Sequence, residues 1–349
     1  MAIKLAINGF GRIGRQVVRA ILEKEAQGEL DKSEIDLVAV NDLTDAKTLA
    51  HLLKYDSVYG ILPNEVEGGA WDSEPFSGFF SVDGKKVGVL NETDPAKLPW
   101  KKLGVDLVIE STGHFVDKAS ASLHLKAGAQ KVIISAPAKE GDVGTYVIGV
   151  NDDDIKKDEK IISNASCTTN CIAPVVKIMN DKFKVLKSLM TTVHAYTADQ
   201  TLVDAPHRDL RRARGAAINT IPTTTGAAIA ATLTIPGLKN KFDGLSIRVP
   251  VPVGSISDIV MLVGDEVTVE EINDFLEAEC KKPEWKGIVT TTYEPLVSSD
   301  IIGNAHSAII DLSLTQVVDG DLVKIIAWYD NECGYSNRMV EQILKWGKR

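Results

Sequence analysis

The chain has 349 residues, of which 44% are hydrophobic and 25% charged, and its formal net charge at pH 7 is −9. This length exceeds one typical hydrophobic core and predicts two domains with an ordinary globular composition. The negative charge argues against nucleic acid or an anionic membrane as the main partner, and no apolar run is long enough to span a bilayer. The start of the chain lacks the pattern of a signal peptide, so we expect a cytoplasmic protein.

The cysteines are few and unevenly placed, at Cys167, Cys171, Cys280 and Cys333. This spacing favours thiols in a reducing compartment over a disulfide framework. The close pair Cys167 and Cys171 would suit a metal or redox site, but no second pair with ligand spacing accompanies it. We therefore expect no metal site.

The chain opens with a short apolar run, Ile3–Ile7, and continues with helical spacing over Arg15–Ala26. Between them, Gly9, Gly11 and Gly14 form a G-x-G-x-x-G pattern. In a dinucleotide-binding turn the first glycine permits the tight turn, the second lets a pyrophosphate approach the backbone, and the third lets helix and strand pack closely. Because a strand precedes this pattern and a helix follows it, we expect a dinucleotide site here.

A second apolar run, Leu37–Val40, ends in Asn41 and Asp42. An acidic residue at this strand end can accept hydrogen bonds from both hydroxyls of an adenosine ribose and would repel a 2′-phosphate, which favours NAD. Asp42 comes late for this pattern, and the polar segment Glu23–Glu34 accounts for the extra length. A strand-end turn or cap is the alternative role of Asp42.

Strand and helix candidates alternate through the first half of the chain, which predicts an α/β fold with a Rossmann-like doubly wound parallel sheet. A surface excursion with a hairpin turn at Asp83-Gly84 is expected over Gly68–Lys86. The predicted strands are Ile3–Ile7, Asp36–Val40, Asp106–Glu110, Lys131–Ser135 and Tyr146–Val150, and the predicted helices are Arg12–Ala26, Asp45–Leu53 and Asp117–Ala127.

Cys167 lies in a small polar run, Ser163–Cys171, which precedes a helix-like segment. The unpaired N–H groups and positive dipole of a helix N-terminus favour a thiolate there. His194 follows 27 residues later at the end of the apolar run Leu189–Val193. A thiolate beside an imidazolium is a recurring activated nucleophile, and the independent dinucleotide motif makes this reading stronger than that of two core residues.

Beyond Cys171 the predicted strands are longer, and Asp319-Gly320 is a hairpin signal. We expect an α+β catalytic domain with a mostly antiparallel sheet and helices on one face. Its predicted strands are Lys187–His194, Gly244–Val251, Ile256–Val263, Ala308–Val318 and Leu322–Tyr329, with helices over Thr268–Lys281 and Tyr335–Lys348.

Two features of this second half predict anion sites. Arg248 interrupts an apolar strand, where a charge is costly without a partner, and Thr225 and Gly226 precede an alanine-rich helix. The alternatives are that Arg248 is an arginine on an edge strand and that Thr225 is a helix cap. The long polar stretch Thr197–Asn219 is of a kind that is usually functional, and it carries Arg208, Arg211, Arg212 and Arg214.

Four segments together resemble phosphorylating glyceraldehyde-3-phosphate dehydrogenase: Asn8–Arg15, Ser163–Cys171, Tyr329–Glu332 and Gly334–Arg338. The resemblance covers essentially the whole chain. It implies an NAD-binding domain of residues 1–165 with the C-terminal helix 332–349, and a catalytic domain of residues 166–331. It further implies a homotetramer that takes NAD, glyceraldehyde 3-phosphate and inorganic phosphate.

In that family the cysteine matching Cys167 attacks the aldehyde and the histidine matching His194 accepts the proton. The cofactor residues that the resemblance implies are Gly9, Gly11, Arg12, Ile13, Gly14, Asp42, Thr112, Gly113, Ser135, Asn331 and Tyr335. One implied anion set is Thr197, Asp199 and Arg248, and the other is Ser166, Thr168, Thr225, Gly226 and Arg214, a role for which Arg211 and Arg212 compete.

The chain departs from the family pattern at two places. Thr93 stands where many relatives carry a basic residue near the adenine, and Ala205-Pro206 matches neither the Leu-Pro of NAD-specific members nor the Ala-Ser of dual-cofactor members. Asp42 followed by Leu43 still favours NAD.

Two other functions remain open at this point. Erythrose-4-phosphate dehydrogenase shares the core motif but hydrolyses its thioester. A dinucleotide-binding redox sensor or interaction protein would use Cys167 without turnover and would need neither His194 nor Arg248.

Overall fold

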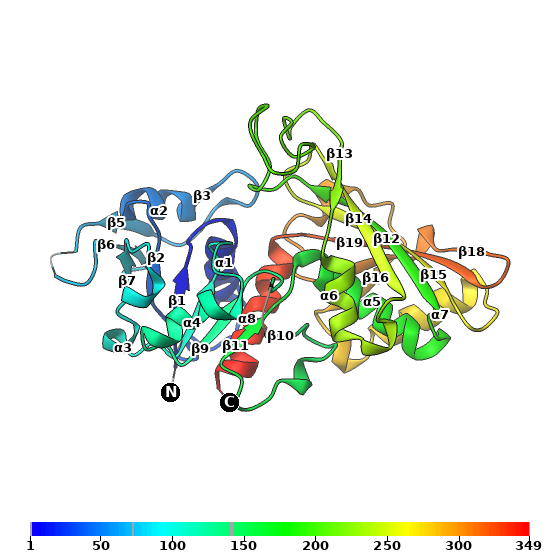
Figure 1. The fold of residues 1–349 in the computed structure, drawn as a ribbon, viewed down its shortest axis with the longest axis horizontal. Coiled ribbons are helices and arrows are strands. Elements are labelled where there is room, and N and C mark those ends of the chain that lie inside the picture. The colour runs from blue at the N-terminus through cyan, green and yellow to red at the C-terminus, as the bar shows by residue number, and fades with distance from the viewer. Residues whose placement is uncertain (1, 72, 140–141, 349) are drawn as a thin grey trace. The chain divides into compact units, whose positions relative to one another are not determined.

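The computed structural model of the chain describes residues 2–71, 73–139 and 142–348. The chain divides into two compact units (Figure 1). Unit 1 comprises Met1–Tyr146, Asp154–Ala165 and Ser336–Arg349, and unit 2 comprises Val147–Asp153 and Ser166–Tyr335.

Unit 1 is built on a nine-stranded sheet with the order β10-β11-β9-β8-β1-β2-β7-β6-β5. The pairs from β10 to β7 are parallel, and β6 pairs antiparallel with both β5 and β7. Its strands are β1 (Ile3–Asn8), β2 (Ile35–Asn41), β5 (Val66–Gly69), β6 (Gly78–Val82), β7 (Lys85–Leu90), β8 (Leu107–Glu110), β9 (Lys131–Ile134), β10 (Gly144–Thr145) and β11 (Ile161–Ser163), and a separate small ribbon pairs β3 (Tyr55–Asp56) with β4 (Gly60–Ile61).

The order of these strands confirms the predicted Rossmann-like sheet. Strand β2 lies on one side of β1 and β8 lies on the other, so the chain reverses direction at β1. Ligands bind beside the carboxyl ends of strands at such a reversal. Strands β8 and β9 are buried at every residue, as expected for strands covered on both faces.

Capping residues mark the ends of several helices of unit 1. The helices of this unit are α1 (Arg12–Gln27), α2 (Ala46–Lys54), α3 (Trp100–Leu103) and α4 (Lys118–Lys126). Asp45 caps α2 by accepting from two backbone N–H groups, and Asp117 forms a capping box with Ser120 at α4. Gly28, with φ of +73°, ends α1 in the left-handed conformation.

Two predictions about unit 1 need correction. Residues 146–150 do not form a strand, because side chains of Asn151 and Asp152 accept from the N–H groups of Val147 and Gly149 and hold a turn. The segment 68–86 is not merely a surface excursion, since β6 and β7 extend the main sheet. The hairpin turn at Asp83-Gly84 is confirmed, with both residues at positive φ.

Unit 2 is built on an eight-stranded sheet that is mostly antiparallel, as predicted; β12–β14 and β16–β17 are its parallel pairs. The strand order is β13-β14-β12-β15-β19-β17-β16, with β18 paired to β19. These strands are β12 (Lys187–Ala195), β13 (Ile221–Thr224), β14 (Phe242–Val249), β15 (Ser255–Leu262), β16 (Val289–Thr292), β17 (Ala308–Asp311), β18 (Gln316–Val318) and β19 (Leu322–Tyr329).

The predicted strand Ala308–Val318 is in fact two strands. A short 3-10 turn over Leu312–Leu314 separates β17 from β18, and the side chain of Asp311 accepts from the backbone N–H of Ser313. The predicted hairpin at Asp319-Gly320 is confirmed between β18 and β19.

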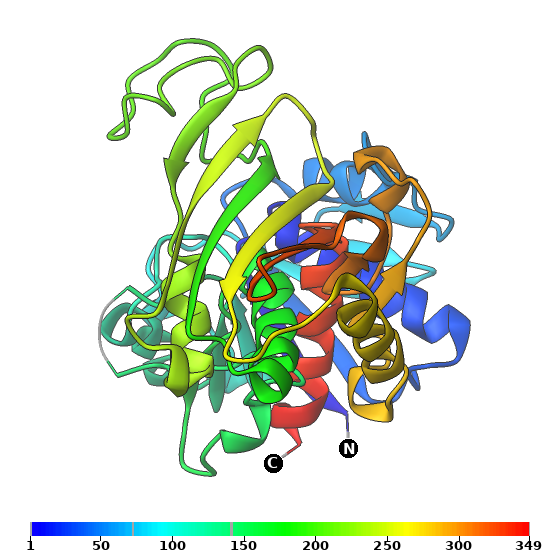
Figure 2. The same ribbon diagram turned by 90° about the vertical axis from the view of Figure 1, so that its right-hand side faces the viewer.

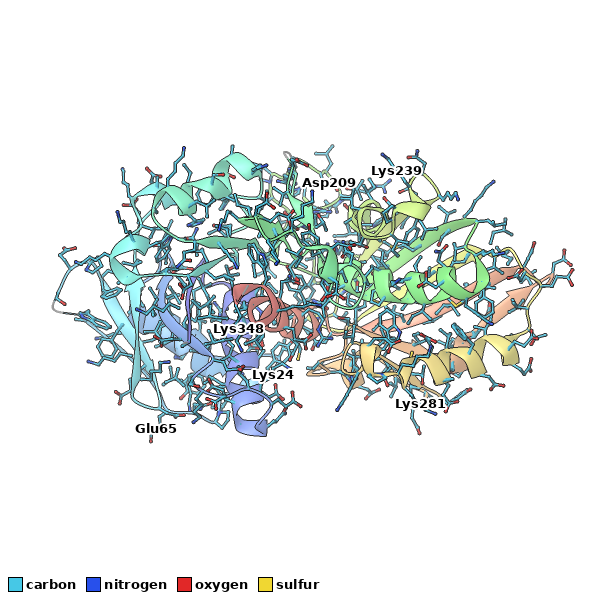
Figure 3. The ribbon with its side chains drawn as sticks, turned by 90° about the horizontal axis from the view of Figure 1, so that it is seen from below. Lys24, Glu65, Asp209, Lys239, Lys281 and Lys348 are labelled. Carbon is cyan, nitrogen blue, oxygen red and sulfur yellow. The ribbon has the colours of Figure 1, made fainter. Side chains whose placement is uncertain are left out.

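Burial alternates along the strands of unit 2, so one face of the sheet is covered and the other is open. The helices α5 (Cys167–Phe183), α6 (Ala227–Thr234) and α7 (Val269–Cys280) pack against this sheet (Figure 2). The last helix, α8 (Cys333–Gly347), begins in unit 2 and continues into unit 1. Charged side chains such as Lys239 and Lys281 extend outward from unit 2 (Figure 3).

Candidate active site

Cys167 is the first residue of α5, as the sequence predicts. Ser166 caps this helix, because its hydroxyl oxygen accepts from the backbone N–H of Thr169 at 3.1 Å. Ala165 precedes the cap with φ of +56°, a strained conformation for a residue with a Cβ. The chain therefore turns sharply into the helix and presents the thiol at its first turn.

The imidazole of His194 lies beside this thiol. The Sγ atom of Cys167 is 3.4 Å from Nε2 of His194, which is almost completely buried near the end of β12. The parallel pairing of β12 with β14 sets Arg248 directly opposite His194. The tertiary structure thus brings together the predicted nucleophile, the predicted base and one predicted anion-binding arginine.

The environment acts strongly on both members of the pair. Burial raises the pKa of the Cys167 thiol, while the charge of Arg248 and hydrogen bonds from Thr168 oppose that rise. Burial and the charge of Arg248 lower the pKa of His194 to about 3. Burial thus acts against charge on both groups, whereas the charge of Arg248 favours the thiolate form of Cys167.

The Nδ1 atom of His194 has two close neighbours, of which one is a hydrogen-bond acceptor and the other a donor. The carbonyl oxygen of Ala195 is 2.7 Å away and can only accept a proton from Nδ1. The Nη1 atom of Arg248 is also 2.7 Å away and can only donate to Nδ1. A proton on Nδ1 leaves Nε2 as an acceptor toward Cys167, which is the tautomer that a base needs.

The structure places a different arginine near this site than the sequence analysis favoured. Arg212 forms an ion pair with Asp199 and donates from Nε to the hydroxyl of Thr223 at 2.9 Å. Its charge also contributes to the lowered pKa values of His194 and Arg248. Arg214, which the sequence analysis placed in the anion set, pairs with Asp204 at 2.8 Å on the surface.

The remaining predicted anion residues lie at turns and helix starts. The backbone N–H of Thr197 donates to the side chain of Gln200, and Thr225 accepts from the N–H of Ala227 at the start of α6. Gly226 is the N-cap of that helix and makes no side-chain cap. The hydroxyl of Thr168 contacts the phenol of Tyr329 at 2.9 Å.

Sequence reasoning gave no role to Tyr329, although a local signal was available. Alternation along β19 puts Tyr329 on the same buried face as Ala327 and Ile325. A phenol on that face needs polar partners, which is a reason to search for a site around it.

In unit 1 the glycine turn has the shape that a dinucleotide requires. Gly9 has φ of +92°, and a Cβ there would lie 2.6 Å from the backbone nitrogen of Thr112. A Cβ at Gly14 would lie 2.5 Å from the carbonyl oxygen of Gly9, whereas a Cβ at Gly11 would meet nothing within 4 Å. Gly11 also caps α1 without any side-chain bond, so the helix N-terminus is open to a pyrophosphate.

Asp42 directly follows β2 and stabilises the glycine turn through its carboxylate. One oxygen of its carboxylate accepts from the N–H of Phe10 at 2.9 Å and the other from the N–H of Thr44 at 3.0 Å. Arg12 and Ile13 begin α1, and the guanidinium of Arg12 pairs with Asp56 at 2.5 Å. Arg12 can therefore serve a pyrophosphate through its backbone, while its side chain is held by Asp56.

A buried network holds the neighbouring strand end. The carboxylate of Glu110 accepts from Asn8 Nδ2 at 2.6 Å, from the N–H of Thr112 at 2.8 Å and from Nε2 of His124 at 2.9 Å. The indole N–H of Trp100 donates to Nδ1 of His124, which puts the histidine proton on Nε2. Glu110 thus fixes Thr112 at the carboxyl end of β8, followed by Gly113 with φ of +75°.

The other predicted cofactor residues lie at strand and helix ends. Ser135 directly follows β9, and its backbone N–H donates to the carbonyl of Glu110. In unit 2 the amide oxygen of Asn331 accepts from Ser255 Oγ at 3.0 Å and from the N–H of Gly254 at 3.2 Å. Its nitrogen end is thereby defined as the donor. Tyr335 is buried in the first turn of α8.

A dinucleotide turn on a parallel sheet in unit 1 and a cysteine–histidine pair in unit 2, formed by the start of α5 and the end of β12, are features of a nicotinamide-dependent dehydrogenase that works through a thiol. The comparisons with known proteins agree. Residues 3–118 match the glyceraldehyde 3-phosphate dehydrogenase NAD binding domain, and residues 166–331 match the C-terminal domain of the same family.

Curated relatives named glyceraldehyde-3-phosphate dehydrogenase match over almost the full length. The protein of Borreliella burgdorferi is 52% identical over 98% of this chain and 99% of its own. The protein of Mycolicibacterium smegmatis is 50% identical over 100% of this chain and 99% of its own. The protein of Streptomyces coelicolor is 52% identical over 98% of this chain and 97% of its own. This chain belongs to the glyceraldehyde 3-phosphate dehydrogenase family, and its cofactor is NAD.

Within residues 2–71, 73–139 and 142–348, no helix is long and apolar enough to cross a membrane. The same part of the chain contains no group of three or more His, Cys, Asp or Glu side chains arranged to hold a metal ion.

Proposed function

We propose that Cys167 and His194 catalyse the oxidation of D-glyceraldehyde 3-phosphate with NAD and inorganic phosphate to 1,3-bisphosphoglycerate, a step of glycolysis and gluconeogenesis. The observation that carries this proposal is the 3.4 Å separation of Cys167 Sγ and His194 Nε2 at the first turn of α5. The names of the relatives that cover the full chain support it.

The reaction starts when Sγ of Cys167 bonds to the aldehyde carbon. The C=O π bond opens, and the carbonyl oxygen takes up a proton from the cysteine–histidine pair to give a hemithioacetal. Nε2 of His194 accepts the hydroxyl proton of that adduct as its C–H bond breaks. Bound NAD supplies the acceptor for the hydride. A thioester then remains on Cys167, and an oxygen of inorganic phosphate attacks its carbonyl carbon. The C–S bond breaks, the acyl phosphate leaves and the thiolate of Cys167 is restored.

The developing oxyanion needs hydrogen-bond donors. The backbone N–H of Cys167 lies in the first turn of α5, where N–H groups have no partner within the helix. Once protonated, His194 is the second donor. The first donor belongs to α5, which also carries the reacting Sγ, and the second belongs to β12.

The arginines near His194 would bind the phosphate groups of substrate and co-substrate. Arg248 lies beside His194, and Arg212 presents a planar guanidinium next to Thr223. Asp199 is a carboxylate and would repel phosphate, so we assign it to orienting Arg212. Ser166, Thr197, Thr225 and Gly226 contribute hydroxyl or backbone N–H groups at turns and helix starts.

Two further features concern the cofactor and the domains. We assign NAD rather than NADP because the carboxylate of Asp42 ends β2 beside the glycine turn. We also propose that residues 1–165 with the C-terminal helix 332–349 bind the cofactor and that residues 166–331 form the catalytic domain. The two family matches, which cover residues 3–118 and 166–331, support this division.

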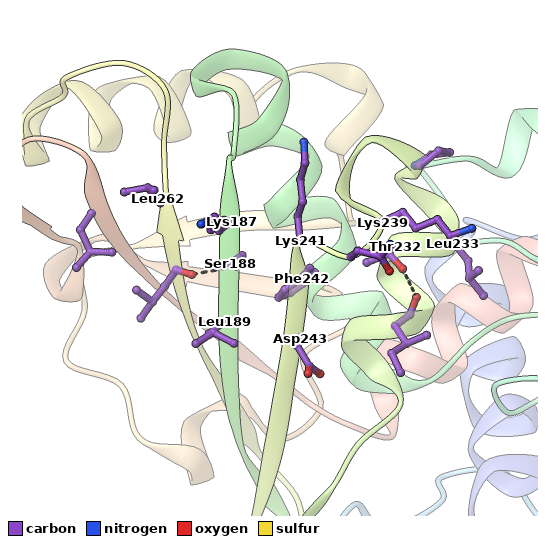
Figure 4. A pocket seen from close by; sticks show the side chains of 15 residues that line it. Lys187, Ser188, Leu189, Thr232, Leu233, Lys239, Lys241, Phe242, Asp243 and Leu262 are labelled. Carbon is purple, nitrogen blue, oxygen red and sulfur yellow. Dashed lines mark hydrogen bonds between the residues drawn. The ribbon is translucent and has the colours of Figure 1, made fainter.

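We propose a cytoplasmic homotetramer whose contacts include the open face of the unit 2 sheet. Leu189 and Leu245 are exposed on this face. A hollow of about 980 Å³ lies nearby, lined by strands β12 and β14 and by α6, and its wall includes Leu189, Leu233 and Phe242 (Figure 4). An exposed apolar surface of this kind is typical of a subunit contact.

The purified protein is tested by following NADH formation with glyceraldehyde 3-phosphate, with and without phosphate, and with erythrose 4-phosphate in parallel. Phosphate-dependent oxidation of the triose is expected. Equal oxidation without phosphate would instead indicate thioester hydrolysis. Cys167→Ser should abolish NADH formation, whereas Cys280→Ser, at a cysteine on α7, should retain it. Activity that survives Cys167→Ser would refute the proposal and leave a non-catalytic role for the thiol.

A further inference from the structure

Three buried hydroxyl groups stand in a row behind the cysteine–histidine pair. The hydroxyl oxygens of Thr168 and Tyr329 are 2.9 Å apart, and those of Tyr329 and Thr192 are also 2.9 Å apart. Thr192 in turn donates to the carbonyl oxygen of Ile256 at 3.3 Å. All three side chains are at most 4% exposed, so these contacts replace those that water would make.

The donor and acceptor of each hydrogen bond in the row follow from the bond that Thr192 makes. A carbonyl oxygen can only accept, so the proton of Thr192 is used on Ile256 and the oxygen of Thr192 accepts from Tyr329. Tyr329 then has no proton left and accepts from Thr168. The hydroxyl proton of Thr168 then lies between the phenol of Tyr329 and the thiol of Cys167, whose pKa the Thr168 side chain lowers.

The two ends of the row are attached to the two reacting groups. Thr168 is the neighbour of Cys167 in the first turn of α5. Thr192 lies two residues before His194 on the same face of β12. The ring of Tyr329 also contacts the imidazole of His194 edge to face, with centroids 6.0 Å apart and planes at 75°.

We propose that Tyr329 is a positioning residue for the reaction assigned above: through Thr168, Thr192 and its own ring it holds Cys167 and His194 at reacting distance. The inference rests on the proposed function for its kinetic test but not for its chemical one. One phenol on β19 joins the start of α5 to β12, two elements that no covalent bond links near the site. A shift of either element would open the gap between Sγ and Nε2.

The phenol remains a hydrogen-bond donor throughout the working pH range. Burial, followed by the neighbouring thiols of Cys167 and Cys171, raises the pKa of Tyr329 well above its ordinary value. The row therefore acts as a fixed support and not as a pH switch.

The test compares Tyr329→Phe, Thr192→Val and the double variant with the wild-type protein. Phenylalanine keeps the ring against His194 and removes only the hydroxyl. Thr192→Ser keeps a hydroxyl in the row and is the conservative rescue. Tyr293→Phe, at an exposed tyrosine outside the site, is the matched control. Each variant is assayed for kcat, for KM with NAD, and for the pH dependence of Cys167 alkylation by iodoacetamide.

In Tyr329→Phe and Thr192→Val we expect kcat to fall by on the order of tenfold, since a buried hydroxyl loses its partner. We expect the KM for NAD to stay unchanged and the alkylation midpoint to move. The kcat of the double variant should fall no further than that of either single variant, because both substitutions interrupt the same row of hydrogen bonds. Thr192→Ser and Tyr293→Phe should behave like the wild type.

Wild-type kcat and alkylation in Tyr329→Phe, or losses that multiply in the double variant, would overturn the proposal. If Tyr329→Phe does not fold, the comparison of Thr192→Val with Thr192→Ser decides in the same way. Alkylation reports on the thiol without substrate. A wild-type protein that fails to oxidise the triose would thus refute the proposed function while the positioning role could still be scored.

Discussion

The Nη1 atom of Arg248 lies 2.7 Å from Nδ1 of His194, its direct neighbour across the parallel strands β14 and β12. A guanidinium at this distance competes with the carbonyl of Ala195 for the same nitrogen. A phosphate bound to Arg248 would draw the guanidinium away and leave the proton of Nδ1 to Ala195. If the proposed function holds, anion binding should therefore change how readily His194 acts as a base.

Arg248→Leu should raise the pKa of His194. The nearby positive charge disfavours the imidazolium, so removing it favours protonation, although burial still opposes this. Because His194 must be neutral to accept a proton, the acid limb of the kcat profile should move to higher pH. The pH dependence of kcat measures this shift, and KM for the substrate should rise as well.

Arg248→Lys is the matched control for this prediction. Lysine keeps the positive charge but lacks the two parallel N–H donors of the guanidinium. It should therefore weaken substrate binding and move the acid limb of the kcat profile less than leucine does. Superimposable profiles for the leucine and lysine variants would contradict an electrostatic role of Arg248 toward His194.

His194→Asn should lower kcat by about 10²–10⁴-fold, the usual contribution of a positioned acid–base group. Its affinity for NAD should be nearly unchanged, because the glycine turn and Asp42 belong to unit 1. Steady-state turnover and a direct NAD titration measure the two effects separately. Undiminished turnover would reject His194 as the base.

Arg212 and Arg214 should differ in their effect on phosphate binding. Arg212→Gln removes charged contacts to Asp199 and Thr223, so KM for the triose or for phosphate should rise about tenfold or more. Arg214→Gln breaks a surface pair with Asp204, and such pairs contribute roughly 0–1 kcal/mol. Comparable KM values for the two variants would restore Arg214 to the anion set.

Glu110→Gln should weaken NAD binding and lower the free energy of unfolding by about 1–3 kcal/mol, because an amide N–H₂ would face donors that now meet a carboxylate. NAD titration and thermal unfolding measure the two changes. The control is Glu29→Gln, at an exposed carboxylate that contacts Lys24. If both variants bind NAD equally well, the network does not position Thr112.

Leu189→Asp should reduce the size of the assembly, because it places a charge on the open face of the unit 2 sheet. Ile61→Asp is the matched control, since both side chains are 65% exposed and Ile61 lies on β4 in unit 1. Light scattering after size-exclusion chromatography gives the masses. A tetramer that persists in Leu189→Asp would move the proposed interface away from this face.

Local patterns in the sequence predicted much of the fold. The glycine turn, the helix start at Cys167 and the hairpins at Asp83-Gly84 and Asp319-Gly320 each depend on a few neighbouring residues. Two errors occurred where side chains bind nearby backbone. Asn151 and Asp152 hold residues 147–151 in a turn, and Asp311 interrupts the strand predicted over 308–318.

The sequence by itself determined the parts of the site whose chemistry is local: a thiol at a helix start, a glycine turn after a strand, and an acidic residue at the end of the next strand. Only the tertiary structure decided which distant groups meet them. The register of β12 with β14 put Arg248 beside His194, the path of the 197–219 segment paired Arg212 with Asp199, and β19 carried Tyr329 between Thr168 and Thr192. Strand pairing joins residues tens to more than a hundred positions apart, and no local spacing encodes that register.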